Sequence, residues 1–236
     1  MNELAAQGTP DLFYLIFMIP PMLLAGWAQS QVKSRYMAAR TMPASCSGAQ
    51  AARRILDSAG LQNVRIEEIE GTLTDHYDPR TKVLRLSSDI YHGQTLAAVG
   101  IAAHEAGHAI QDATHYPLMV IRQMAVPMAS IGGGAGMSIV AVGVALGAIG
   151  LVLLGVLLFS GVAIFQLVNL PVEYNASARA KQILPQLGIV SQGQMPMIRK
   201  VLGAAALTYV AATLSAVMQV LYFVLRLFAG SQQRRR

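Results

Sequence analysis

The chain has 236 residues, of which 54% are hydrophobic and 13% are charged, and it carries a formal net charge of +6. A soluble domain has about 25% charged residues, so this composition indicates a membrane protein with a modest soluble part. The basic residues lie beside apolar segments and are not interleaved with aromatic residues, which argues against a nucleic-acid partner. The single cysteine, Cys46, cannot form a disulfide within the chain.

The first apolar segment covers residues 10–29, which is long enough for one bilayer crossing. Asp11 lies at its start, and the pair Pro20-Pro21 predicts a kink that membrane helices tolerate. A cleaved signal peptide is the alternative, but such a peptide carries positive charge before its apolar core. No Lys or Arg precedes this segment. We therefore expect residues 1–32 to form an N-terminal transmembrane anchor.

Residues 33–116 have a mixed pattern that predicts a small α+β domain. An amphipathic stretch ends at Gly60, and two alternating stretches are separated by a turn at Asp78-Pro79-Arg80. A domain of this size buries little core alone, so we expect it to pack against the membrane helices. The expected elements are a helix over 47–59, strands over 64–67 and 83–87, and a helix over about 94–113.

The last of these helices carries H-E-x-x-H at residues 104–108. Residues four apart share a helix face, so the imidazoles of His104 and His108 can reach one ion, with Glu105 beside it. The pattern can occur by chance, but two His and one Glu in an apolar helix are costly to bury without a purpose. We therefore expect one Zn²⁺ per chain, held by His104 and His108, with Glu105 as general base.

The next segment, residues 117–170, is expected to form a transmembrane hairpin. No charged residue lies between 123 and 172, a run that is too long for one crossing and fits two. We place the crossings near 118–141 and 148–170, joined by a glycine-containing turn. Three glycines at 132–134 fall inside the first crossing, where small residues allow close helix packing.

A catalytic zinc usually has three protein ligands. The extended metzincin pattern is absent, because Gln111 and Thr114 stand where it requires Gly and His. The first charged residue after the hairpin is Glu173, and two crossings return it to the side of the H-E-x-x-H motif. We expect residues 171–202 to form a helix, beginning near Pro171, and a loop, with Glu173 as third ligand. The alternative is a helix-start Glu that only meets the helix dipole.

A final apolar stretch over 201–229 is long enough to cross with tilt, so residues 203–236 are expected to form a transmembrane helix and a basic tail. Positive charges follow the first crossing and the hairpin, which places both loops and the site in the cytoplasm. The tail Arg234–Arg236 disagrees, since a fourth full crossing would put it outside. The charges that set this orientation are Lys33, Arg35, Arg40, Arg53, Arg54, Arg179, Lys181, Arg199 and Lys200.

H-E-x-x-H, a hydrophobic hairpin and a Glu-aromatic-x-Ala helix together resemble the membrane zinc proteases of the HtpX and CAAX prenyl protease type. The chain is more similar to the YugP-like membrane zinc metallopeptidases, and this resemblance covers nearly the whole chain. It implies a mainly α integral membrane protein with about four transmembrane helices and a small α+β zincin-like metal-binding domain. The similar segments are 52–61, 75–87, 102–111, 170–180 and 206–212.

The resemblance implies a membrane-bound zinc protease with His104, His108 and Glu173 as ligands and Glu105 as base. One position departs from the prenyl-protease pattern. That group has Asp four residues after its ligand Glu, whereas this chain has Ser177, which orients an imidazole more weakly.

Four other side chains are candidates for orienting a ligand or stabilising an oxyanion: Ser177, His76, Tyr77 and Tyr209. Ser177 can face the same site as Glu173, four residues before it. His76 or Tyr77 could face the cleft and polarise the scissile carbonyl, although a solvated hairpin turn is the favoured interpretation. Tyr209 could donate a hydrogen bond to the oxyanion, or it could form a hydrogen bond to a neighbouring helix. If the fold is zincin-like, a free edge of the strand containing Val83, Leu84, Arg85 and Leu86 could pair with the substrate.

The expected function is zinc-dependent endopeptidase activity on peptides or membrane proteins, with Glu105 removing a proton from an activated water and passing it to the leaving amine. The alternative is a non-catalytic membrane scaffold or assembly factor with a structural zinc. Such a site normally has four protein ligands and does not need Glu105. The expected setting is the cell membrane, crossed several times, with a regulatory membrane partner or a second copy of the chain as further partners.

Overall fold

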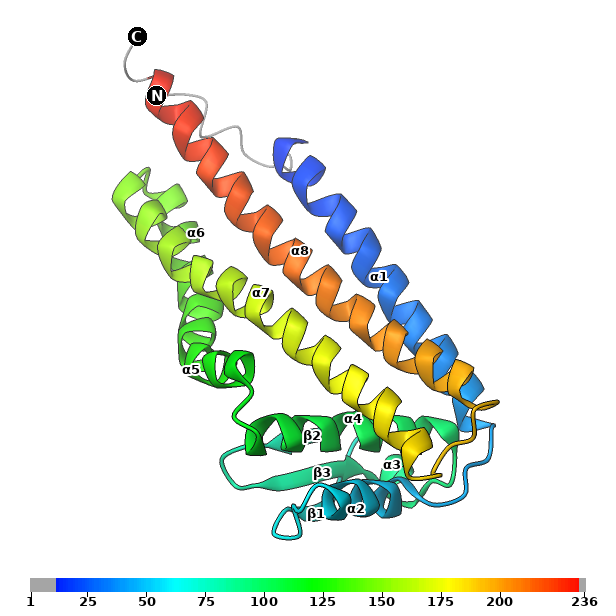
Figure 1. The fold of residues 1–236 in the computed structure, drawn as a ribbon. Helices are drawn as coiled ribbons and strands as arrows, with labels where there is room; N and C mark the ends of the chain where they lie inside the picture. Colours follow the sequence, from blue (N-terminus) through cyan, green and yellow to red (C-terminus); the bar gives the residue numbers. More distant parts are fainter. Residues whose placement is uncertain (1–11, 234–236) are drawn as a thin grey trace. The chain divides into compact units, whose positions relative to one another are not determined.

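The computed structural model describes residues 12–233 (Figure 1). Four of its helical segments are long and apolar enough to cross a membrane: Leu12–Arg40, Pro117–Ala145, Ile149–Gln186 and Met195–Leu227. The expected fold class is confirmed: the protein is mainly α, with four candidate membrane spans and a small α+β region. Asp11 and the Arg234–Arg236 tail lie outside the described residues.

The chain forms two compact units, which are described separately. The first, called the α+β unit, comprises residues 28–120 and 171–208; the second, called the helical unit, comprises residues 12–27, 121–170 and 209–233. The helices are α1 (Leu12–Arg40), α2 (Gly48–Ser58), α3 (Ser88–His92), α4 (Leu96–Ala113), α5 (Pro117–Ile131), α6 (Met137–Ala145), α7 (Ile149–Gln186) and α8 (Met195–Gln233), with a π-helical turn, η1 (Gly132–Gly136).

Local sequence signals set the ends of the two helices that were predicted in the α+β unit. Ser47 caps α2: its hydroxyl accepts the N–H of Gln50, while the Gln50 side chain accepts the N–H of Ser47. Gly60 follows this helix with φ +74°, a backbone conformation that favours glycine. Thr95 caps α4 by accepting the N–H of Ala98. Both helices are therefore confirmed to within one or two residues.

The sheet of the α+β unit has the strand order β1-β3-β2. Strand β1 (Arg65–Ile69) runs parallel to β3 (Val83–Ser87), and β2 (His76–Asp78) runs antiparallel to it on the other side. The expected free edge over Val83–Leu86 is therefore wrong, because β3 is the central strand. Only three residues form β2, which is too short for the alternating pattern that identifies a strand in a sequence.

The core of the α+β unit includes residues from both of its chain segments. Ile55 of α2, Leu84 of β3 and Leu96 of α4 are fully buried, as are Leu184 of α7 and Ile198 of α8. The ends of two long helices thus complete a core that residues 33–116 could not build alone.

Helix α7 runs without interruption from Ile149 to Gln186, and Pro171 lies inside it. The expectation that a new helix begins near Pro171 is therefore wrong. A proline removes one backbone hydrogen bond, and apolar membrane helices accept this loss while keeping their other bonds. The turn before α7 contains Gly147, with φ +63°, and the crossing before that turn extends over Pro117–Ala145.

Candidate metal centre

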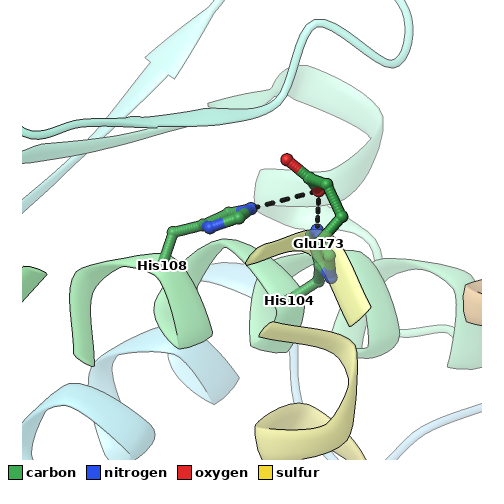
Figure 2. Close-up of side chains that lie close together, drawn as sticks. All are labelled: His104, His108 and Glu173. Atoms are coloured by element: carbon green, nitrogen blue, oxygen red, sulfur yellow. Dashed lines mark hydrogen bonds and ion pairs between the residues drawn. The ribbon is translucent and has the colours of Figure 1, made fainter. Parts of the chain in front are cut away.

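Helices α4 and α7 bring two imidazoles and one carboxylate together in the α+β unit (Figure 2). His104 Nε2 lies 3.1 Å from Glu173 Oε2, and His108 Nε2 lies 3.4 Å from the same oxygen. The three ligand atoms all lie within 4.8 Å of one another. One chain segment supplies both histidines, because residues four apart share a helix face.

The three side chains are deeply buried, with exposed fractions of 9% for His104, 7% for His108 and 3% for Glu173. The two imidazole rings meet edge to face, at 87°. Buried groups of this kind are costly unless they are paired or coordinate a metal ion. Two imidazole nitrogens and one carboxylate oxygen are a donor set that Zn²⁺ accepts, so the residues present fit a zinc ion.

A glycine inside the motif permits the close approach of the two helices. A Cβ atom at Gly107 would lie 2.8 Å from the backbone carbonyl oxygen of Ala176 on α7. No real Cβ contact is that short, so a larger residue at this position would separate α4 from the segment that carries Glu173. The sequence H-E-A-G-H therefore places the ligands and also makes room for the third one.

Glu105 lies beside the three ligand residues without joining them, and it is buried among the same helices. Its Oε2 accepts the backbone N–H of Tyr77 in β2, at 3.1 Å. Burial raises the pKa of Glu105 to about 8, although the nearby imidazole of His104 opposes this shift. A bound cation would oppose it further, because a positive charge favours the carboxylate form.

The second ring nitrogen of each histidine also has a partner. His104 Nδ1 lies 3.1 Å from the Ser177 hydroxyl, and His108 Nδ1 lies 2.9 Å from Gln111 Oε1. Partners of this kind fix the ring orientation of metal-binding histidines. Ser177 thus lies beside one of the predicted ligands, four residues after Glu173 on α7.

In a comparison with known protein families, the sequence model of the family described as "Putative neutral zinc metallopeptidase" matches residues 14–228. The chain belongs to this family. It is also 41% identical over 224 residues to a Bacillus subtilis (strain 168) protein named "Putative membrane protease YugP", covering 94% of this chain and all of that protein. No solved structure matches the chain.

Two sets of contacts around the donor set were not predicted from the sequence. Gln111 is fully buried and joins His108 to α7 by hydrogen bonds. The sequence feature that could have identified it is a polar residue on an apolar helix, three positions after a ligand. The Tyr77 hydroxyl donates to Asp112 Oδ2 at 2.7 Å, and Lys82 pairs with the same carboxylate. Burial and the bond to Asp112 raise the pKa of the Tyr77 phenol. No signal along the chain indicated that Tyr77, Asp112 and Lys82 would meet, because they lie in β2, in α4 and in the turn before β3.

Of the other candidate residues, His76 does not belong to the ligand cluster. His76 is exposed, and its Nδ1 lies 2.8 Å from the backbone carbonyl of Thr74. Tyr209 belongs to the helical unit. Val83, Leu84, Arg85 and Leu86 belong to the central strand, which pairs with β1 along its length and with β2 at Val83–Arg85.

Proposed function

We propose that the protein is a zinc-dependent endopeptidase whose metal ligands are His104, His108 and Glu173 and whose general base is Glu105. One observation carries the proposal: a three-residue donor set lies next to a buried carboxylate that is held by a backbone N–H and is not part of the set. Membership of a zinc metallopeptidase family supports the same chemistry.

A bound zinc ion supplies a Lewis acid for the scissile carbonyl and lowers the pKa of a water molecule to about 7. The chain's own residues do the rest. Glu105 takes a proton from the attacking water and returns it to the leaving amine. Oε2 accepts the Tyr77 N–H, and we assign the transferred proton to Oε1. Ser177 and Gln111 orient the two imidazoles.

The substrates we propose are peptides or membrane proteins. The relative from Bacillus subtilis is named as a membrane protease, and this chain has four helices that could cross a bilayer. A structural zinc in a non-catalytic scaffold is the competing function. Structural sites normally have four protein ligands. Within residues 12–233, the cluster that could hold a metal has three.

The test of this function is Glu105→Gln, a change that keeps the shape of the side chain but removes the base. We expect full zinc content and a loss of ~10²–10⁴-fold in peptide cleavage. Metal analysis and mass spectrometry of a synthetic peptide mixture measure the two quantities. Glu70→Gln, on an exposed part of the same unit, is the matched control. Wild-type turnover in the Glu105→Gln variant contradicts the base assignment, and a zinc-loaded wild type without cleavage favours the scaffold.

We also propose that the site faces the cytoplasm, because the basic residues cluster in the loops beside it. Single cysteines replace the exposed Thr72 and Gln192 in a chain whose Cys46 has been changed to Ala. Both should be shielded from a membrane-impermeant thiol reagent in intact cells and react after the membrane is opened. Labelling of both in intact cells would move the site outside, and labelling of one would break the shared side that the metal ligands require.

A further inference from the structure

We infer that Arg179, Asn175 and Gln111 form a directed chain of hydrogen bonds that fixes which nitrogen of His108 faces the metal. These are positioning residues, and the inference rests on the proposed zinc site. This series of hydrogen bonds runs from the partly exposed side of α7 to the buried face of α4, within the α+β unit.

The direction is set at Arg179. A guanidinium group only donates hydrogen bonds and stays charged at all ordinary pH values. Its Nε donates to Asn175 Oδ1 at 2.8 Å, one helical turn earlier on α7. The atom of Asn175 that faces Arg179 must therefore be the amide oxygen rather than the amide nitrogen.

The same oxygen then orients the next amide. Gln111 Nε2 donates to Asn175 Oδ1 at 3.0 Å and to the backbone carbonyl of Val172 at 2.8 Å. Neither acceptor carries a hydrogen, so both hydrogens of the Gln111 amide are used on α7. The Gln111 side chain cannot turn round without placing its oxygen against two other oxygens. Its Oε1 must consequently point at His108.

The final step concerns the histidine itself. Gln111 Oε1 can only accept, so His108 Nδ1, at 2.9 Å, must carry a hydrogen. In the neutral imidazole, the lone pair is then on Nε2, the nitrogen that faces Glu173. His104 differs, because its partner is the Ser177 hydroxyl, which can donate or accept.

The hydrogen-bond chain also links α4 and α7, the two helices that carry the ligands. Val172 is the residue before the ligand Glu173, and Gln111 lies three residues after the ligand His108 on α4. Gln111 is fully buried, so each hydrogen bond it loses would leave a polar group without water. One side chain thus sets the ligand nitrogen on α4 and holds the carboxylate-bearing segment of α7.

The experiment measures zinc affinity by competition with a chelator, on full-length protein in detergent. Gln111→Leu should weaken zinc binding by roughly 10- to 100-fold, as the loss of a histidine's partner does elsewhere. Asn175→Leu should act in the same direction. Asn175→Asp should keep wild-type affinity or exceed it, because both of its oxygens accept and the direction of the chain is preserved.

Two further variants complete the design. Arg179→Met removes the directing donor at a partly exposed position, and we expect zinc binding to weaken by roughly two- to tenfold, the value of one hydrogen bond. Gln194→Leu is the matched control, since Gln194 bonds to Pro43 and Ser191 and not to the site. The absorption spectrum of the Co²⁺-loaded protein should change in Gln111→Leu and stay unchanged in Gln194→Leu.

Failure of the proposed function and failure of this inference give different results. A wild-type protein that binds no zinc contradicts the metal site itself. If the wild type binds zinc, and Asn175→Leu and Arg179→Met bind it as tightly as Gln194→Leu does, the zinc site stands and the hydrogen-bond chain is overturned. Equal losses in Asn175→Asp and Asn175→Leu also overturn it, because the loss would then not depend on hydrogen-bond direction. If Gln111→Leu does not fold, the Asn175 pair and Arg179→Met decide the question.

Discussion

The two units of the protein bury different kinds of polar side chain. In the α+β unit, the buried polar side chains include two imidazoles and two carboxylates, and hydrogen bonds link α4 to α7 and to β2. In the helical unit, glycines let backbones approach closely: a Cβ at Gly155 would lie 2.6 Å from the carbonyl oxygen of Gly136. Both units have close glycine approaches, but the buried imidazoles and carboxylates lie in the α+β unit, whereas the buried polar side chains described in the helical unit are the neutral Asn169, Thr213 and Gln219.

This difference shows how function can be separated from membrane packing. Association of helices in lipid relies on small residues that let backbones approach, and it carries no chemistry of its own. Buried polar clusters are costly unless every member is paired, so they mark the part of a protein with a functional reason to keep them. We therefore expect changes beside the metal ligands of the α+β unit to alter zinc binding and equivalent changes in the helical unit to alter stability alone.

Glu173→Ala should have the largest effect. It removes one of three ligands, and we expect zinc affinity to fall on the order of 10³-fold, because loss of a supporting partner alone costs roughly 10- to 100-fold. Chelator competition measures the change. His115→Ala is the control, because His115 is exposed just after α4. If His115→Ala empties the site instead, the ligand set is wrong.

A pair of glycine substitutions tests the comparison directly. Gly107→Ala in the α+β unit and Gly155→Ala in the helical unit each push a methyl group against a backbone carbonyl, at 2.8 Å and 2.6 Å. Both should destabilise the protein, by about 1–3 kcal/mol for overpacking of this kind. Only Gly107→Ala should also weaken zinc binding, because it displaces the segment of α7 that carries Glu173.

Thermal unfolding and chelator competition measure the two effects of that pair. Gly203→Ala provides the reference, since a Cβ at Gly203 would meet nothing within 4 Å. Weakened zinc binding in Gly155→Ala would show that the two units do not divide stability from metal binding.

Tyr77→Phe should have the smallest effect. It removes the hydrogen bond from the phenol to Asp112 but keeps the backbone N–H that holds Glu105. The loss of one such bond is worth about 1 kcal/mol, so we expect peptide cleavage to slow by roughly two- to tenfold with zinc content unchanged. Steady-state kinetics and metal analysis check this, with Tyr91→Phe as the control. A loss of zinc in Tyr77→Phe would place this residue in the metal site rather than beside the base.

The parts of the fold that the sequence predicted were those with local signals. H-E-x-x-H specifies two side chains on one helix face, and Ser47 and Gly60 mark the ends of α2. Glu173 was found because it is the first charge after a long apolar run, which is also a signal along the chain. Predicting these features requires only the geometry of a helix and the free-energy cost of burying a charge.

The features that could not be predicted depend on contacts between distant segments. Strand β2 has three residues and exists because β3 offers it an edge, so its pairing left no pattern in the sequence. The continuity of α7 through Pro171 depends on surroundings that accept the lost hydrogen bond. The role of Gln111 requires α7 to lie against α4, which spacing along the chain does not reveal.

The most direct test of the zinc site is X-ray absorption at the zinc edge of the purified wild-type protein. We expect one zinc per chain, nitrogen and oxygen neighbours at about 2.0–2.1 Å, and outer scattering from two imidazole rings. A spectrum with sulfur at about 2.3 Å, or with no imidazole scattering, would contradict a site built from His104, His108 and Glu173.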